Sequence, residues 1–519
     1  MKRVVLMKNL LLFSLMISAL LTVPAQDSVN QTERQLIENT IRLYFDGWAT
    51  GDRTKLDKAM HFSCRLKNFR DGKFIEYDKA TYLGFFNKPR ARDKNLQTRI
   101  LSIDITDIVG SAKVEIITEK DVFTDYFNLM KTNEGWFIVD KVAVRKSRTS
   151  GDVPLIKPEL NVKPQKEIVL ENLKRPWSIA FLSEEEALVA EKEGDLVKVN
   201  LSTKQKVIIK GFPDDRTGKR VEYSGENDGL FEVIIDPDFN KNKFVYVSYA
   251  AQNEQGTATK VIRGVLDNDS LSQVQTIFVA TPYTAQRFHY GGGMTFGRDG
   301  KLYLTVGERL FKEIDEPALP IAQNVEDKRG KIYRLNPDGS VPKDNPDFGA
   351  KAIPGLYALG IRAAQGITVE PETNKIWFSE HGTFQGDEIN VLKARANYGW
   401  SIKTTGKYRS DDYVPPPAKE TAFTDPAWFW LQTVAPTGLI FYTGDEFPLW
   451  KNNLLVAGLS RGSLWRFKIE GETIKSVEEL FADDRMRLRK VAQSPAGKLY
   501  ILTDEMNGKV IRIRNANVI

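Results

Sequence analysis

The sequence predicts an all-β propeller of six blades, preceded by a small α+β domain. Two observations predict this division. Apolar residues at helical spacing, followed by strand-rich runs, fill the first part of the chain, and a strand–turn–strand unit then recurs up to the C-terminus. The composition, with 41% hydrophobic and 27% charged residues, is that of a globular protein and excludes a disordered or fibrous chain.

Residues 1–25 are interpreted as a signal peptide. Lys2 and Arg3 precede an apolar run over residues 10–21, and small residues follow up to Ala25. This run is shorter than the ~20 residues that a membrane-spanning helix needs, so cleavage near Ala25 is favoured over a membrane anchor. We therefore expect an exported protein, periplasmic or secreted, without stable membrane insertion after cleavage.

The charge distribution argues against a nucleic-acid partner. The 74 basic and 68 acidic residues are interspersed along the chain, and part of the formal charge of +6 lies in the leader. A nucleic-acid-binding surface would instead concentrate basic residues. Cys64 is the only cysteine, so no disulfide forms within the chain.

Residues 27–148 are expected to form the α+β domain. Apolar residues recur at helical spacing between residues 36 and 48, and β-rich runs follow at 99–108, 112–117 and 136–144. A sheet that curls around the helix would bury the apolar faces of both elements. His61 and Cys64 are interpreted as packing residues rather than as a metal site or a nucleophile.

Residues 149–166 are expected to be a linker, because they are charged, contain Pro154, Pro158 and Pro164, and show no periodicity. The repeated unit follows over residues 167–519. Its expected first strands lie at residues 178–181, 231–234, 294–296, 367–369, 439–441 and 490–492, each followed by a turn and a second β-rich run. Six copies favour a propeller over a β-sandwich, because radial repetition is how short strands avoid exposed edges.

Polar residues precede the expected first strands and should converge on one end of the propeller axis. They are Asn227, His289, Arg362, Gln365, Thr437, Arg487 and Arg489. Planar cationic donors gathered around one axis suit an anionic ligand that carries several carboxylates. The alternative is that individual arginines cap backbone carbonyls at the channel mouth.

His289 is the candidate general base of this set. It precedes Tyr290 and the glycines Gly291 to Gly293, which we interpret as room for a bulky ligand beside the imidazole. The alternative is a structural histidine, but its place before an axial strand favours catalysis.

An oxygen-rich loop is expected on the fourth blade, over residues 382–390 and 397–400. Oxygen donors at irregular spacing suit calcium better than zinc or magnesium. The alternative is a polar loop held by Asx turns.

Several longer motifs occur in order along the second part of the chain. They are His289-Tyr290-Gly291-Gly292 and residues 330–340, 359–366, 379–382, 386–390, 397–400 and 434–438. In these motifs the chain resembles the soluble glucose/sorbosone and aldose sugar dehydrogenases that use pyrroloquinoline quinone (PQQ). Residues 27–148 resemble the NTF2-like superfamily, in its lumazine-binding-protein-like branch.

The resemblance implies an exported quinoprotein that oxidises aldose sugars at the anomeric carbon to lactones, with PQQ, Ca²⁺ and an external electron acceptor. His289 matches the family's general base, and Arg362 matches the arginine that polarises the quinone. Arg487 and Arg489 match the pair that holds the carboxylates of the cofactor.

The metal ligands are implied in the same way. Gly382 and Thr383 match the residues whose backbone carbonyls hold the calcium that activates the cofactor. Glu388 and Tyr398 match positions whose backbone oxygens bind a structural calcium in the aldose branch.

Some positions depart from the family pattern. Asn227 stands in place of a glutamine, Ala363 of an asparagine, Thr383 of a proline and Lys490 of an aspartate. Ser460 aligns with a lysine that holds the cofactor in the glucose branch, and we include Asn227, Gln365 and Ser460 in the expected cofactor-binding set.

Two other functions are therefore considered. A propeller that has lost catalysis would bind a glycan or a protein partner. A calcium-dependent lactonase is disfavoured, because the expected axis is lined by arginines rather than by carboxylates that would hold a catalytic metal.

Overall fold

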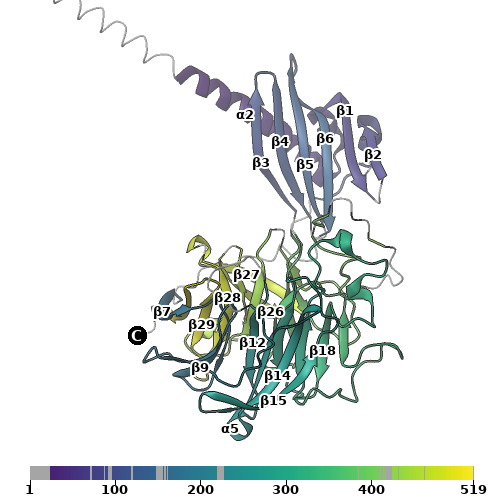
Figure 1. The fold of residues 1–519 in the computed structure, drawn as a ribbon. Coiled ribbons are helices and arrows are strands. Elements are labelled where there is room, and N and C mark those ends of the chain that lie inside the picture. The colour runs from purple at the N-terminus through teal and green to yellow at the C-terminus, as the bar shows by residue number, and fades with distance from the viewer. Residues whose placement is uncertain are drawn as a thin grey trace, which may run out of the picture. The chain divides into compact units, whose positions relative to one another are not determined.

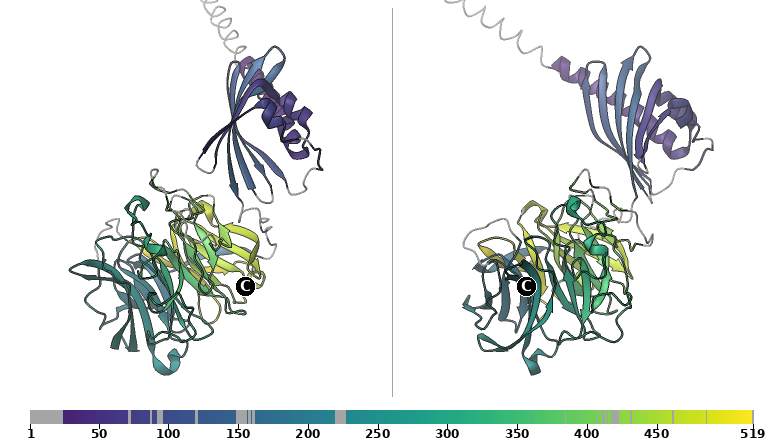
Figure 2. Two further views of the ribbon diagram at one scale, coloured as in Figure 1. Left: turned by 90° about the vertical axis from the view of Figure 1, so that its right-hand side faces the viewer. Right: turned by 45° about the vertical axis from the view of Figure 1, so that its right-hand side comes forward.

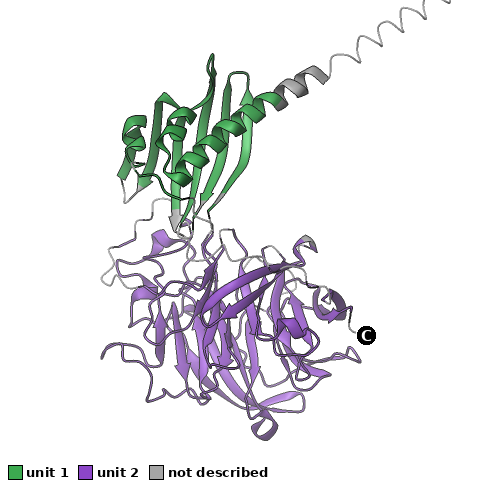
Figure 3. Ribbon diagram, turned by 180° about the vertical axis from the view of Figure 1, so that it is seen from behind, with its two compact units in different colours: residues 1–148 green, residues 149–519 purple. Residues whose placement is uncertain are grey.

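The computed structural model describes residues 24–517, apart from residues 71–72, 87, 92–95, 119–120, 148–155, 157–158, 160–161, 219–226, 384, 407, 411–412, 414, 417–422, 431, 461 and 485. The chain divides into two compact units, Met1–Arg148 and Thr149–Ile519 (Figure 3). Of the expected signal peptide, only Pro24 and Ala25 belong to the described residues, where they begin a helix. Within the described part, no helix has the length and apolar character needed to cross a membrane.

The N-terminal unit is a curved six-stranded sheet with helices against one face (Figure 2). The strand order is β2-β1-β6-β5-β4-β3, with β1 and β6 parallel. The elements are α2 (Pro24–Thr50), α3 (Arg53–Ala59), β1 (Met60–Arg70), β2 (Lys73–Asp78), α4 (Lys79–Leu83), β3 (Gln97–Thr106), β4 (Val109–Ile117), β5 (Asp121–Thr132) and β6 (Gly135–Ser147).

The core of this unit lies between α2 and the sheet. Ile37, Ile41 and Tyr44 of α2 are fully buried at helical spacing, which is the amphipathic pattern seen in the sequence. Cys64 is buried in the same core, and burial raises the pKa of its thiol to about 12, so it packs as an unreactive apolar residue. His61 lies near the surface, with Nδ1 2.7 Å from the Ser63 hydroxyl.

The C-terminal unit consists of six four-stranded antiparallel sheets (Figure 1). In chain order they are β8 (Pro176–Phe181), β9 (Glu186–Glu191), β10 (Leu196–Asn200) and β11 (Lys206–Ile208); β12 (Leu230–Ile235), β13 (Phe244–Asn253), β14 (Gly256–Asp267) and β15 (Ser270–Val279); β16 (Gly291–Phe296), β17 (Leu302–Val306), β18 (Lys331–Leu335) and β19 (Leu356–Leu359); β20 (Ala364–Val369), β21 (Ile376–Glu380), β22 (Glu388–Val391) and β23 (Trp428–Phe429); β24 (Pro436–Phe441), β25 (Leu454–Gly458), β26 (Leu464–Glu470) and β27 (Thr473–Leu480); and β28 (Leu488–Gln493), β29 (Leu499–Thr503), β30 (Gly508–Asn515) and β7 (Pro164–Leu173). A short helix, α5 (Phe239–Asn242), and 3₁₀ turns at Glu313–Asp315, Ile321–Gln323, Pro448–Trp450 and Ala482–Asp484 lie in the connections.

The first strands of these sheets form a closed ring. β8, β12, β16, β20, β24 and β28 each contact the next, and β28 contacts β8. Each contains one of the first strands expected from the sequence. This circular packing is the arrangement of a β-propeller, in which loops at one end of the ring meet around a common axis.

The segment expected to be a linker is partly built into the C-terminal unit. Glu159 accepts charged hydrogen bonds from Arg466 at 3.2 Å and Lys468 at 3.3 Å, and β7 already begins at Pro164. β7 pairs with β30, the last strand of the chain, so it completes the sheet that closes the ring. Of the prolines that suggested a linker, Pro164 is the first residue of β7, at the edge of its sheet, where proline is tolerated, and the other two lie outside the described residues.

Candidate active site

A pocket of about 250 Å³ lies at the end of the ring where loops precede the inner strands. The structure brings together there most of the residues expected to act, namely Asn227, His289, Arg362, Gln365, Gly382, Thr383, Arg487 and Arg489. A larger cavity of about 450 Å³ is lined by the inner strands themselves, including Glu232 and Lys490, and shares no lining residue with this pocket.

His289 is held by a carboxylate that the sequence analysis did not single out. Its Nδ1 lies 2.9 Å and 3.1 Å from the two carboxylate oxygens of Glu308, which follows β17. Leu310 donates its backbone N–H to Glu308 Oε2 at 3.1 Å, which favours the ionised carboxylate. When Glu308 is ionised, the Nδ1–H of His289 donates to its carboxylate and Nε2 keeps a lone pair.

Burial and charge set the protonation of this pair. Burial, followed by the nearby Arg362, lowers the pKa of His289 well below its usual range, so the imidazole is neutral. Burial raises the pKa of Glu308 to about 8. His289 also has a φ of 46°, a left-handed conformation that is uncommon outside glycine and is found at sites whose geometry is fixed by function.

Gly292 and Gly293, which follow His289, allow neighbouring inner strands to pack closely. A Cβ on Gly292 would lie 2.8 Å from the Phe231 ring, and one on Gly293 would lie 2.6 Å from the Gln365 carbonyl. Phe231 and Gln365 belong to the two neighbouring inner strands. Close approach of adjacent inner strands therefore already accounts for Gly292 and Gly293, whereas Gly291 lines the pocket beside His289.

Arg362 lies directly beside the imidazole, with Nη2 3.4 Å from His289 Nε2. Its Nη1 donates to the Gly382 carbonyl at 2.6 Å, and its guanidinium lies over the Trp400 ring at 5.2 Å. Its Nε is buried and makes no hydrogen bond with any residue that the structure describes.

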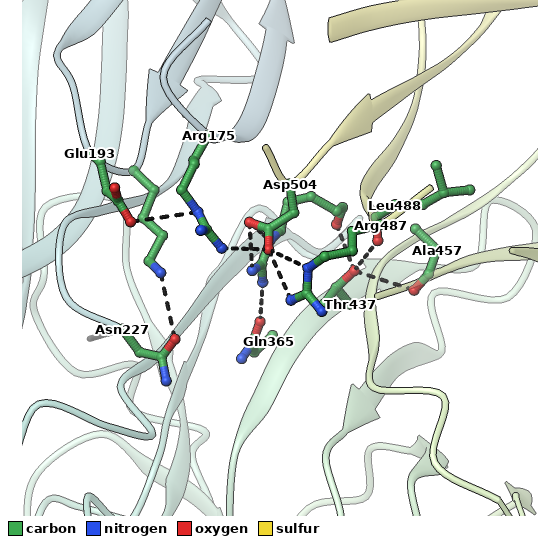
Figure 4. Close-up of polar contacts among 11 residues, drawn as sticks. Arg175, Glu193, Asn227, Gln365, Thr437, Ala457, Arg487, Leu488 and Asp504 are labelled. Carbon is green, nitrogen blue, oxygen red and sulfur yellow. Dashed lines mark hydrogen bonds and ion pairs between the residues drawn. The ribbon is translucent and has the colours of Figure 1, made fainter. Parts of the chain in front are cut away.

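Arg487 and Arg489 are gathered on one carboxylate. Asp504 Oδ2 accepts from Arg487 Nη2 at 3.0 Å and from Arg175 Nη2 at 2.8 Å, and Oδ1 accepts from Arg489 Nη2 at 3.0 Å (Figure 4). Burial alone would oppose ionisation, but Arg489 and its neighbours hold the pKa of Asp504 well below its usual range. Arg489 also donates to Gln365 Oε1 at 2.6 Å.

Two other expected residues have different surroundings. The Thr437 hydroxyl donates to the Arg489 carbonyl at 2.6 Å, so it supports the wall behind the pocket (Figure 4). Ser460 is exposed, and its neighbour Leu459 lines the pocket in its place.

The expected metal residues lie in two adjoining places. Gly382 and Thr383 line the main pocket, where the buried Thr383 hydroxyl makes no hydrogen bond to a described residue. Glu388 and Tyr398 line a neighbouring cavity of about 20 Å³ together with Glu380, the strand partner of Glu388. Within the described ranges, no group of three or more His, Cys, Asp or Glu side chains could hold a metal.

Both glutamates of the small cavity resist ionisation. Burial, followed by Glu388, raises the pKa of Glu380 to about 8, and burial raises the pKa of Glu388 to about 7. The Tyr398 hydroxyl points away and donates to the Val391 carbonyl at 2.7 Å. Side chains alone therefore make no calcium cage here, and any metal would depend on backbone oxygens and these two carboxylates.

Comparison with known proteins decides the family. Residues 173–512 match the family described as Glucose / Sorbosone dehydrogenase. The chain belongs to this family. The prediction made from the motifs is confirmed, and residues 32–142 match the family described as Putative lumazine-binding.

Relatives that are named as sugar dehydrogenases are similar to this chain over most of their length. The aldose sugar dehydrogenase YliI of Escherichia coli (strain K12) is 30% identical over 360 residues, which cover 68% of this chain and 93% of the relative. The quinoprotein glucose dehydrogenase B of Acinetobacter calcoaceticus is 27% identical over 418 residues, covering 65% of this chain and 85% of the relative. A crystal structure of a glucose dehydrogenase matches with a TM-score of 0.62 at 32% identity, over 67% of this chain and 99% of that chain.

In this member of the glucose/sorbosone dehydrogenase family, sequence reasoning missed polar residues that follow the second strands. Lys192 follows β9, Glu308 follows β17 and Asp504 follows β29, and all three lie at or beside the pocket. In an antiparallel sheet the end of the second strand lies beside the start of the first. The same positional rule that identified His289 and Arg487 would have found these residues, had it been applied to both strands.

Proposed function

We propose that this protein oxidises aldose sugars at the anomeric carbon to lactones on a six-bladed propeller, with PQQ, calcium and an external electron acceptor. The observation that carries the proposal is one shared pocket. The His289–Glu308 pair and the Arg362 guanidinium meet there, beside a cationic wall that includes Arg487 and Arg489.

The pocket suits a cofactor of this charge. PQQ is a planar quinone with three carboxylates, and guanidinium groups bind carboxylates in planar, charge-assisted pairs. Among the described lining residues Asp387 is the only carboxylate, and its oxygens accept backbone N–H groups of Gly382, Val434 and Ala435 at 2.7–2.8 Å. Positive charge therefore predominates where the cofactor would lie.

Proton transfer is assigned to His289. Its Nε2 carries the lone pair that accepts the proton of the anomeric hydroxyl, and Glu308 then stabilises the imidazolium through Nδ1–H. Burial, followed by Arg362, lowers the pKa of His289 and so keeps the free imidazole neutral, which a base requires. When bound, the quinone supplies the hydride acceptor and calcium supplies Lewis-acid polarisation.

Calcium is proposed at the Gly382–Thr383 segment and at the small cavity beside Glu388 and Tyr398. Backbone carbonyls and the unpartnered Thr383 hydroxyl are oxygen donors, which Ca²⁺ prefers. A divalent cation beside Glu380 and Glu388 would offset the repulsion between two buried carboxylates.

We also propose that the protein is exported, to the periplasm or the medium, after cleavage near Ala25. The sequence pattern of the leader supports this proposal. The N-terminal unit is proposed to have a structural or interaction role, because its described residues include no histidine–carboxylate pair like His289 and Glu308; its buried acid–base pair is Asp125 and Lys141, at 2.9 Å.

The test is reconstitution of the purified protein with PQQ and Ca²⁺, followed by a turnover assay on a panel of aldoses with an artificial electron acceptor. We expect sugar-dependent reduction of the acceptor by the wild type and by His61→Asn, a matched histidine control in the N-terminal unit, but not by His289→Asn. A bound quinone without turnover on any aldose would instead favour the non-catalytic propeller.

A further inference from the structure

His289 and Arg309 share an uncommon backbone conformation on two adjoining segments. The φ of His289 is 46° and that of Arg309 is 72°, so both residues are left-handed although neither is glycine. Gly307 N donates to the Tyr290 carbonyl at 3.1 Å, which places the two segments side by side at the end of the β16–β17 pair. Such a conformation persists only where the surrounding contacts fix it, and it is found at functional sites. The contacts that hold His289 in this conformation are therefore candidates for a role in the reaction.

The Arg309 side chain holds the backbone that precedes His289. Arg309 is 1% exposed, and its Nε donates to the Phe288 carbonyl at 2.8 Å. Its Nη1 donates to the Thr257 carbonyl at 3.1 Å, and its Nη2 donates to the Thr257 hydroxyl at 2.9 Å and to the Gln286 carbonyl. Four of the five N–H donors of the guanidinium are thus used to hold this segment against β14.

The same guanidinium also fixes the residue that follows His289. It lies over the Tyr290 ring, 3.7 Å from the ring centroid, which is a favourable cation–π distance. The Tyr290 hydroxyl lies 2.7 Å from the Thr257 hydroxyl, and Tyr290 is 3% exposed. Arg309 therefore restrains the chain on both sides of His289, whereas its neighbour Glu308 contacts the imidazole itself.

We propose that Arg309 is a positioning residue for the base and that it fixes the backbone around His289 so that Nδ1 meets Glu308. This inference rests on the proposed function, in which His289 takes the proton of the anomeric hydroxyl. Arg309 lies outside the set of described residues that line the pocket, so it acts through His289 rather than on the sugar or the cofactor. With Nδ1 engaged by Glu308, the lone pair of Nε2 keeps one direction in the pocket.

Replacing Arg309 by lysine tests this role. Arg309→Lys keeps the positive charge but offers one nitrogen in place of three, so it cannot replace all of these hydrogen bonds. We expect turnover to fall roughly 10- to 100-fold, because a small displacement of a catalytic group has an effect of this size, while the PQQ affinity measured by titration should stay that of the wild type. The control is Arg466→Lys. Arg466 is also 1% exposed, lies over the Trp450 ring at 5.0 Å and binds Glu478 on the outer strands of the fifth sheet, so this variant should keep wild-type turnover even where its melting temperature falls.

A measurement without cofactor or substrate reports the position of the imidazole directly. The chain has 3 histidines, so selective ¹⁵N labelling of histidine gives one set of ring signals for each, and His61→Asn and His381→Asn assign them. At pH 9 Glu308, with a pKa of about 8, is mostly ionised, and the wild type should show His289 as the Nδ1–H tautomer alone, because the carboxylate accepts that proton. Arg309→Lys should show a mixture of the two tautomers, whereas Arg466→Lys should retain the single one.

The outcomes separate the inference from the proposed function. Either a single Nδ1–H tautomer or wild-type turnover in Arg309→Lys overturns the inference but leaves the proposed function standing. A loss of turnover that Arg466→Lys shows to the same extent also overturns it, because the effect then follows stability. If Arg309→Lys does not fold, Thr257→Val removes one acceptor of the guanidinium and Thr257→Ser keeps it as the control, and a wild-type tautomer in Thr257→Val overturns the inference. Failure of the wild type to oxidise any aldose overturns the proposed function, and the tautomers of Arg309→Lys then decide whether Arg309 holds His289.

Discussion

Replacing Glu308 by glutamine tests how the base is prepared for proton transfer. Glu308 is 1% exposed, and its two oxygens serve His289 Nδ1 at 2.9 Å and Leu310 N–H at 3.1 Å. A glutamine amide has one oxygen and one NH₂ group. Its oxygen can accept from only one of these two donors, and its NH₂ group then faces the other donor without forming a hydrogen bond. We expect turnover to fall roughly 10²- to 10⁴-fold, because His289 is left in the wrong tautomer or without a counter-charge for its imidazolium.

The pH profile makes this prediction more specific. The pKa of Glu308 is about 8, and the active form requires the ionised carboxylate. The wild-type kcat/KM should therefore rise as the pH increases through about 8. This rise should vanish in Glu308→Gln but persist in the control Glu313→Gln, whose buried carboxylate accepts the backbone N–H groups of Arg409 and Ser410.

The ionisation of Glu308 should also make stability depend on pH, but in the opposite direction to kcat/KM: stability should fall as the pH rises. Its pKa moves from 4.5 when unfolded to about 8 when folded, so its contribution to stability is present at low pH and is lost as the pH rises through about 8. The full effect of such a shift is about 5 kcal/mol. At pH 9, Glu308→Gln should thus melt no lower than the wild type. Undiminished turnover in Glu308→Gln, or a loss of turnover matched by a loss of melting temperature at pH 9, would refute the reasoning.

Three other predictions concern the base, the metal and the N-terminal unit. His289→Ala should keep PQQ binding but lose roughly 10²- to 10⁴-fold in turnover, whereas Arg362→Ala should weaken both PQQ binding and turnover. Quinone titration measures binding and steady-state assays measure turnover. Equal effects of the two variants would contradict the separate roles of base and cofactor contact. Chelation of calcium should lower the melting temperature and readdition should restore it, since a ligand of the native state stabilises it; an unchanged melting curve counts against the metal. A fragment of residues 149–519 should retain dehydrogenase activity, because it keeps Glu159 and all of β7; activity found only in residues 1–148 would contradict this.

The inner strands could be predicted because their burial requires a hydrophobic pattern that repeats along the sequence. Each first strand is a short apolar run bounded by turn residues, and this pattern recurs whatever the length of the insertions. β7 could not be found in the same way. It is an edge strand with exposed polar positions, and its pairing with β30 joins residues that are more than 300 positions apart.

The site was predictable only in part for a similar reason. The motif around His289 predicts a base, but the sequence does not show which carboxylate orients it, since Glu308 lies in the loop that follows the next strand of the sheet, β17. The gathering of Arg175, Arg487 and Arg489 on Asp504 likewise joins the first and last sheets, which become neighbours only when the ring closes. The position after a second strand indicates which residues lie near the pocket, but it does not show which of them pair with one another.

Reduction of the bound cofactor by substrate tests the central claim most directly. The PQQ- and Ca²⁺-loaded protein is titrated with an aldose in the absence of oxygen and of any electron acceptor, and the quinone absorbance is followed. The account predicts that the oxidised quinone band disappears with one sugar per bound PQQ and that the sugar is recovered as its lactone. A band that persists with every aldose, while PQQ remains bound, would contradict it.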